Sequence, residues 1–335
     1  MSVRFGFSFD MRNPAEWRKP WADHYRETLD LIAWTETLGF EQVCIAEHHG
    51  DEDGYCPSPL VVMATLAGMT KTMRLSTGIG LAPFYPPVRL AEDVAVLDII
   101  SNGRVELTLG LGYLKREFKA YGIDVKSRGR RTNEVIEIVR PLLAGEEVTY
   151  TGQYYQIEKA RIRPLPVQRP HIPIFVGGFV KAAYERAIKY GDGYFGPTEM
   201  LPAYLETVVE AGRDPAKERI SLLGTADSWL VVSHDPEKAM AEVAPHFYYQ
   251  WNVYSKWAEE GDTPLPKMDF DTFKQSGIMN VLTPEQAIAH IGKRLDDFPQ
   301  IESYCLQAPA GLPADRFTPY IETFAKEVLP ALKAR

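Results

Sequence analysis

Strand-like and helix-like patterns alternate along this chain from one end to the other. Apolar residues occupy every second position at 3–9, and they recur at helical spacing at 21–38 until Gly39 ends the repeat. Further strands are expected at 42–46, 74–81, 104–111, 173–177, 193–195, 221–232 and 303–307. Helices are expected at 58–69, 88–100, 130–143, 180–190, 201–211, 236–248, 284–295 and 316–333. This order predicts about eight strand–helix units.

Units of this kind form either a closed barrel or a doubly wound open sheet. The open sheet usually carries a glycine-rich dinucleotide loop after its first strand. Residues 9–14, which follow the first strand here, contain no glycine. We therefore predict the α/β class and a (β/α)8 TIM barrel.

The chain is longer than a minimal barrel. A barrel typically takes about 250 residues, whereas this chain has 335, so we expect one domain, residues 1–335, with insertions at about 146–170 and 255–283. Residues 149–156 are typical of a β-hairpin, and the polar second insertion contains Pro264 and Pro266. A connection that long is usually functional or disordered.

Composition narrows the classes of partner. A formal net charge of −8 argues against binding to nucleic acid or to an anionic membrane. No apolar run is long enough to span a bilayer, and no signal peptide is recognisable. The three cysteines, Cys44, Cys56 and Cys305, are scattered and odd in number, which indicates a reducing compartment. We expect a cytoplasmic protein.

The sequence Glu47-His48-His49 follows the second expected strand directly. Carboxyl ends of barrel strands surround the active site in this fold. No other expected strand end offers a histidine, so a metal site is disfavoured. One of the two histidines is then a general base or a hydrogen-bond donor, or it is a buried structural residue.

Three expected strands end in glycines instead of side chains. These are Gly78 with Gly80, Gly110 with Gly112, and Gly177 with Gly178. Glycine allows a ligand to approach the backbone closely, so the three ends predict a broad, flat ligand. Gly177–Phe179 also leads into a helix, and a late barrel loop before a helix is the usual phosphate cradle. Flavin mononucleotide (FMN) is a flat ligand with a phosphate.

Residues 246–254 are the densest aromatic stretch in the chain. One interpretation is a helix packed on the barrel. The other is a wall of the substrate pocket that includes Phe247, Tyr248 and Trp251, followed by a mobile lid.

At several stretches the chain resembles the luciferase-like flavin monooxygenase family. These are 46–49, 87–94, 97–104, 117–124 and 328–332, in matching order and spacing. The resemblance implies a barrel that binds reduced FMN, supplied by a separate flavin reductase. Dioxygen then forms a C4a-peroxyflavin that oxygenates an apolar small molecule, such as an aldehyde or a ketone. The resemblance also implies a homodimer.

The resemblance assigns roles to individual residues. His48 matches the catalytic histidine, and the Gly78–Ile79 peptide matches a non-prolyl cis bond under the flavin ring. Gly177, Gly178 and Phe179 match the segment at the ring edge and phosphate, while Phe7 and Gly110 complete the expected cofactor site.

Two positions depart from the luciferases. Gly110 stands where they have a reactive cysteine, which argues against light emission. Leu111 stands where they have an arginine that pairs with the flavin phosphate. The phosphate charge would then be met by Arg128, Arg130 or Lys181, or by backbone amides.

Two other functions remain open. Some members of the family use a deazaflavin for hydride transfer to or from a substrate, without oxygen. A non-catalytic flavin-binding protein of the same fold is the third reading.

Overall fold

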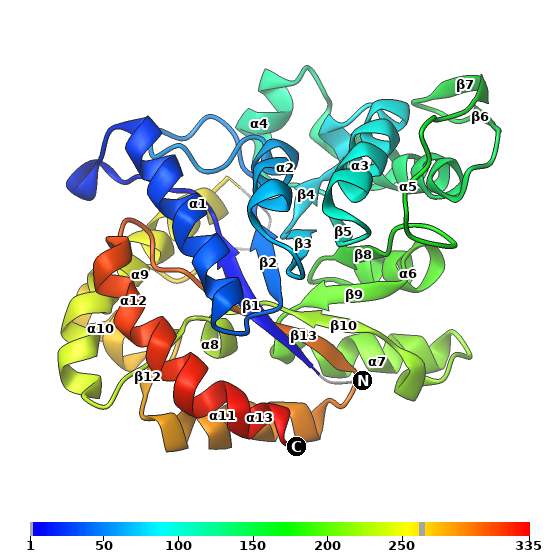
Figure 1. Cartoon of the computed structure of the whole chain (residues 1–335). Coiled ribbons are helices and arrows are strands. Elements are labelled where there is room, and N and C mark those ends of the chain that lie inside the picture. Colours follow the sequence, from blue (N-terminus) through cyan, green and yellow to red (C-terminus); the bar gives the residue numbers. More distant parts are fainter. Residues whose placement is uncertain (1–2, 261–264) are drawn as a thin grey trace.

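A computed structural model describes residues 3–260 and 265–335. In that part of the chain a nine-stranded parallel sheet closes into a barrel, because β1 pairs with both β2 and β13 and β3 pairs with β5 (Figure 1). Its strands are β1 (Arg4–Phe9), β2 (Gln42–Ile45), β3 (Arg74–Thr77), β4 (Gly80–Leu81), β5 (Val105–Gly110), β8 (Ile174–Gly177), β9 (Gly193–Gly196), β10 (Ile220–Leu222) and β13 (Ile301–Gln307). The two-residue β4 only extends the edge of β5, so among the described residues eight strands form the barrel, as predicted.

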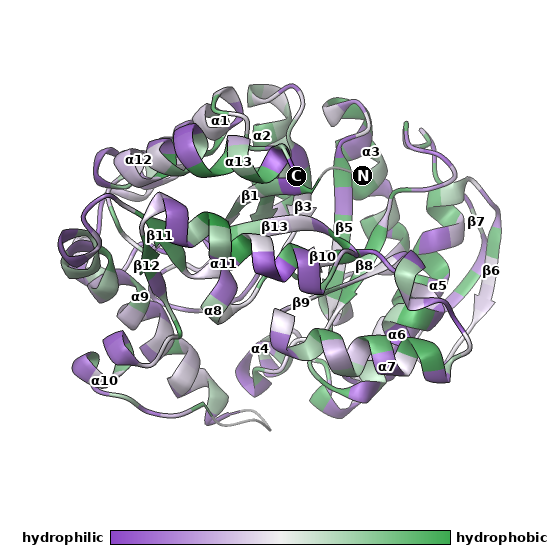
Figure 2. Cartoon of the chain, turned by 90° about the horizontal axis from the view of Figure 1, so that it is seen from below, coloured by the Kyte–Doolittle hydropathy of each residue, from purple (hydrophilic) through white to green (hydrophobic). Residues whose placement is uncertain are grey.

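Helices cover the outside of the barrel. They are α1 (Trp21–Thr37), α2 (Pro59–Met69), α3 (Pro87–Ser101), α4 (Lys115–Ala120), α5 (Arg128–Ala144), α6 (Lys181–Tyr190), α7 (Leu201–Glu210), α8 (Thr225–Ser228), α9 (Pro236–Ala258), α10 (Phe270–Gln275), α11 (Pro284–Asp297), α12 (Ala314–Thr323) and α13 (Leu329–Lys333). Figure 2 shows these helices around the strands, with hydrophilic and hydrophobic residues both occurring along them. None of the described helices is both long enough and apolar enough to cross a bilayer.

The first insertion is the predicted hairpin, formed by β6 (Val148–Thr151) and β7 (Gln156–Ala160), which pair antiparallel. Its turn is attached to α5 by Glu134. This carboxylate accepts hydrogen bonds from the backbone amides of Gln153, Tyr154 and Tyr155 at 2.9–3.2 Å. Three donated amides hold the hairpin turn against α5.

The region after the seventh barrel strand differs from the prediction. A single strand at 221–232 is wrong, because the chain leaves the barrel at Leu222 and turns through α8 before it forms β11 (Leu230–Val232). The new strand pairs with β12 (Asn280–Leu282), outside the barrel. The expected helix at 236–248 continues to Ala258 as α9. Within the second insertion, 265–283 includes α10 and β12, while Pro264 lies outside the described residues.

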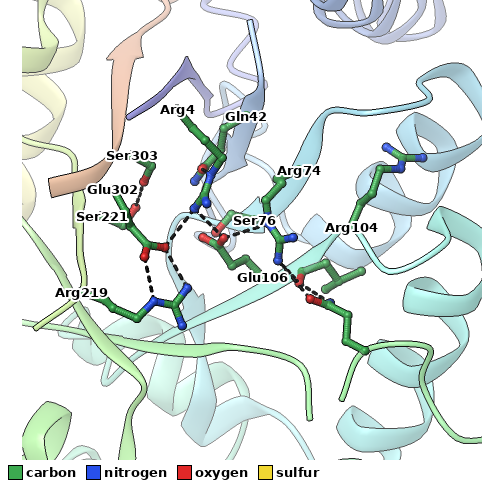
Figure 3. A network of polar contacts seen from close by, with 12 residues as sticks. Arg4, Gln42, Arg74, Ser76, Arg104, Glu106, Arg219, Ser221, Glu302 and Ser303 are labelled. Atoms are coloured by element: carbon green, nitrogen blue, oxygen red, sulfur yellow. Dashed lines mark hydrogen bonds and ion pairs between the residues drawn. The ribbon is translucent and has the colours of Figure 1, made fainter. Parts of the chain in front are cut away.

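Charged side chains fill the barrel interior at the amino-terminal ends of the strands (Figure 3). Glu106, fully buried, accepts hydrogen bonds from Arg4 at 2.8 Å and from Arg74 at 3.0 Å. Glu302 accepts from Arg4 at 3.0 Å and from Arg219 at 2.7 Å. This end of a barrel serves stability, so the opposite mouth is where we place the chemistry.

Candidate active site at the carboxyl-terminal mouth of the barrel

His48 lies just beyond β2 and is held by a carboxylate from α4. Its Nδ1 is 2.9 Å from Oε1 of Glu117, and the same oxygen accepts the backbone amide of His49 at 2.7 Å. Glu117 is buried and acts only as an acceptor here, so Nδ1 of His48 carries the proton. Among the described residues Nε2 has no hydrogen-bond partner, and this nitrogen offers a lone pair when the ring is neutral.

His49 is tied into the loop that carries His48. Its Nε2 is 3.1 Å from Oε1 of Glu47, and its Nδ1 is 3.1 Å from the Tyr121 hydroxyl. Glu47 also accepts the amide of Leu81 at 2.6 Å and the hydroxyl of Tyr85 at 2.8 Å. Burial raises the pKa of Tyr85, and the neighbouring Glu47 carboxylate raises it further. Glu47 therefore joins the ends of β2 and β4.

Aromatic rings surround His48. The ring centroids of Trp257, Tyr55 and Tyr113 lie 4.7, 4.8 and 5.5 Å from that of His48. Trp257 and Tyr55 are buried, whereas Tyr113 is 37% exposed and borders the solvent side. Such a wall excludes water from the imidazole and offers apolar surface to a ligand.

Arg12 lies behind these rings, fully buried. Its guanidinium carbon is 4.4 Å from the ring centroid of Tyr55 and 4.8 Å from that of Trp257. It forms ion pairs with Asp10, at 3.1 Å, and with Asp53. Burial raises the pKa of Asp10 despite the adjacent arginine. The cation holds the two aromatic rings in place against His48.

The peptide between Gly78 and Ile79 is cis, as the resemblance implies. The side chain of Ile79 lies over two of the glycine strand ends. A Cβ on Gly110 would be 2.6 Å from Cγ2 of Ile79, and a Cβ on Gly177 would be 2.4 Å from its Cδ1. These two glycines therefore make room for Ile79, which places an apolar side chain at the centre of the mouth.

The segment before α6 remains open to solvent. Gly178 has a φ of +148°, and a Cβ there would approach the Cβ of Ala183 to 2.5 Å. Phe179 is 65% exposed. No side chain in the described part of the chain caps the first turn of α6. The amide of Ala183 donates to the carbonyl of Val180 at 2.8 Å, whereas those of Lys181 and Ala182 have no partner among the described residues, an arrangement suited to an anion.

Four expected site residues lie elsewhere. Phe7 is buried outside the barrel, with its ring 4.8 Å from Phe40, because alternate residues of β1 face the helices. The expected pocket residues Phe247, Tyr248 and Trp251 pack with Trp229 and Phe273 under the second insertion. A helical stripe of rings forms core packing here, and α9 reaches His48 through Trp257 instead.

Three residues at the mouth were missed by the sequence reasoning. Glu117 lay in a stretch that carried the family resemblance, and that stretch was its only signal. Trp257 and Arg12 had none, because their partners are distant along the chain. Among the described residues, no group of three or more His, Cys, Asp and Glu side chains is placed to hold a metal ion.

Known proteins are similar to this chain over most of its length. A family model described as luciferase-like monooxygenase matches residues 3–292. The oxygenase component of flavin-dependent trigonelline monooxygenase from Acinetobacter baylyi is 26% identical over 92% of this chain and 89% of its own length. An F420-dependent glucose-6-phosphate dehydrogenase from Amycolatopsis mediterranei is 27% identical over 92% of this chain and 95% of its own.

Two further matches cover different shares of the chain. An uncharacterised protein from Sinorhizobium fredii is 32% identical over 170 residues, so the chain covers 48% of that relative. The crystal structure of monooxygenase RslO1 from Streptomyces bottropensis superposes with a TM-score of 0.83 at 28% identity, over 98% of this chain and 99% of that one. The chain is thus similar over most of its length to oxidoreductases of two kinds.

Proposed function

The chain belongs to the luciferase-like monooxygenase family, and from this premise we propose that it uses reduced FMN and dioxygen to oxygenate an apolar small molecule, such as an aldehyde or a ketone. The observation that carries the proposal is the His48–Glu117 pair inside an aromatic wall. The pair places a proton acceptor among aromatic rings that exclude water.

The residues of the mouth fit a flavin. Ile79 lies over Gly110 and Gly177 and offers an apolar platform for a ring. The free amides before α6 suit a phosphate. When bound, reduced FMN supplies the two electrons that activate dioxygen.

His48 is the proposed catalytic residue. Glu117 keeps the proton on Nδ1, so Nε2 receives a proton from the substrate side and returns it later. Tyr55 and Trp257 keep water from the imidazole, and Tyr113 borders the entrance for an apolar substrate. The roles of the Gly78–Ile79 peptide and of Gly178 and Phe179 at a flavin stay predictions.

The proposal includes partners. We propose that a separate flavin reductase supplies the reduced cofactor, that the chain acts as one domain in the cytoplasm, and that it forms a homodimer. The similar trigonelline monooxygenase protein from Acinetobacter baylyi is itself an oxygenase component, which supports the proposal of a separate reductase.

Transfer of labelled oxygen tests the proposal. Protein loaded with reduced FMN under anaerobic conditions is mixed with 18O2 and a panel of aldehydes, ketones and terpenes. We expect one product to carry 18O, as read by mass spectrometry. His48→Ala should lower product formation by about 100-fold and leave the flavin Kd within about twofold. The exposed His234→Ala serves as the control. A panel without any labelled product contradicts the proposal.

Hydride transfer with a deazaflavin is the second candidate function, because a dehydrogenase that depends on F420 is 27% identical over nearly the whole chain. Reduced deazaflavin offered without oxygen to the same panel separates the two. Its oxidation by a ketone or an aldehyde favours this candidate. A protein that binds flavin tightly but turns over with neither cofactor would be a carrier, and His48→Ala would then change nothing.

A further inference from the structure

Arg186 is a buried cation without a countercharge. It lies on the second turn of α6 with 9% of its surface exposed. Its Nε donates to Oδ1 of Asn133 at 2.6 Å, and its buried Nη1 has no hydrogen-bond partner among the described residues. No carboxylate of that part of the chain forms an ion pair with it, and burial lowers the pKa of the guanidinium. An unpaired charged donor in such a site is costly.

Three neighbouring cations differ in this respect. Arg130 pairs with Glu134, Arg140 with Asp192 at 2.6 Å, and Lys181 with Glu210 at 2.6 Å. Two of these, Arg130 and Lys181, were candidates for the flavin phosphate from sequence. Their carboxylate partners already meet their charge, whereas Arg186 keeps its own uncompensated.

The guanidinium of Arg186 points toward the amino terminus of α5. Its Nε lies at Asn133, on the second turn of that helix, and its Nη2 lies 3.4 Å from where a Cβ on Gly129 would stand, on the first turn. A cation at a helix amino terminus is repelled by the helix dipole, while an anion is attracted. At this end α5 continues from the 3-10 turn Val125–Ser127, in which the amide of Arg128 donates to the carbonyl of Val125, and no side chain of the described residues caps α5 itself. Both features call for an anion between α5 and α6.

We propose that Arg186 and the first turn of α5 bind the terminal phosphate monoester of the flavin. The inference rests on the proposed use of FMN, and it supplies the charge that Leu111 cannot provide. Gly129 leaves space for the guanidinium. The segment 177–180 leads into the same helix that carries Arg186, so the phosphate lies between two helix amino termini.

The test compares FMN with riboflavin, which lacks the phosphate. Reduced forms of both are titrated anaerobically into the whole protein, with quenching of tryptophan fluorescence as the signal. Arg186→Gln should weaken FMN binding by about 10- to 100-fold and leave riboflavin binding unchanged. Arg140→Gln, which removes an arginine already paired with Asp192, should preserve the wild-type ratio of the two Kd values. Equal losses for both flavins in Arg186→Gln overturn the proposal.

A second measurement tests the anion site at Arg186 without a flavin. Inorganic phosphate, compared with chloride at equal ionic strength, should raise the Tm of the wild type and not that of Arg186→Gln. Arg186→Lys, which keeps a charge but loses the fork of donors, should recover part of the shift if the glutamine variant folds poorly. If the wild type binds neither flavin, the proposed function fails, and the phosphate shift still decides the anion site. Equal shifts in wild type and variants overturn it.

Discussion

Oε1 of Glu117 lies 2.9 Å from Nδ1 of His48 and 2.7 Å from the backbone nitrogen of His49. One buried oxygen therefore orients the imidazole and the loop that carries it. Because a carboxylate accepts and does not donate, it selects the tautomer that leaves Nε2 unprotonated.

Glu117→Gln tests this relationship. An amide can present its NH2 group to Nδ1, which favours the opposite tautomer and blocks Nε2 as an acceptor. We expect kcat to fall by about 10- to 100-fold, with the flavin Kd nearly unchanged and the pH–rate profile displaced. Glu52→Gln, an exposed change in the neighbouring loop, is the control. A parallel loss of flavin affinity would indicate a structural role only.

Gly177→Ala tests the platform at the mouth. The added Cβ would stand 2.4 Å from Cδ1 of Ile79, so this side chain must move. We expect flavin affinity to fall by about 10-fold or more, since an overpacked site costs about 1–3 kcal/mol. Gly177→Ala combined with Ile79→Ala should restore part of the affinity. Gly68→Ala, in open space on α2, should leave binding unchanged; no rescue by the double variant contradicts the argument.

Glu106→Ala tests the charged side chains inside the barrel at the amino-terminal ends of its strands. The change leaves Arg4 and Arg74 without their shared buried carboxylate (Figure 3). Removing one partner of a buried pair costs about 3–5 kcal/mol, and urea unfolding should show a loss near the lower value because both arginines are 22% exposed. Glu92→Ala removes only an exposed contact to Arg89 and should cost less than about 1 kcal/mol.

The lowered pKa of Glu302 should make the protein less stable at acid pH. Burial alone would raise the pKa of Glu302, but the hydrogen bonds and ion pairs with Arg219 and Arg4 hold it below its ordinary value of 4.5. A lowered folded-state pKa adds stability that is complete above pH 4.5 and is lost as the pH falls through the folded value. The free energy of unfolding, measured with urea at several pH values from about 5 to 3, should fall less steeply with decreasing pH for Glu302→Gln than for the wild type. An unchanged slope refutes the assignment.

The proposed homodimer has a candidate surface on α2 and α3, which lie side by side (Figure 1). Val61 is 67% exposed, and Val96 and Ile100 on α3 are 43% and 53% exposed. Ile100→Glu should convert a dimer to a monomer in sedimentation velocity, because a buried charge without a partner is costly. Val209→Glu, an equally exposed residue on α7, is the control. A wild type that sediments as a monomer removes this part of the proposal.

Local patterns were sufficient for the architecture. The period of two at 3–9 and the helical period at 21–38 correspond to β1 and α1, and Thr283 with Gln286 forms a capping box at the start of α11. Such features depend on neighbours in the chain, so a single sequence contains them. The single strand expected at 221–232 was wrong because its two apolar stretches, 222–223 and 229–232, lie in or beside strands of separate sheets and the short helix α8 lies between them.

The sequence therefore predicted that His48 lies at a strand end, that glycines end strands at the mouth, and which family the chain belongs to. It did not predict the contacts that join distant segments. Glu117 reaches His48 across 69 positions of the chain, and Arg186 meets Asn133 across 53. Whether Phe7 or Phe247 faces a ligand or the core also depends on which neighbours surround it. Side-chain partners of this kind exist only once the barrel has closed, and that is why the tertiary structure alone decided the tautomer of His48 and the uncompensated charge of Arg186.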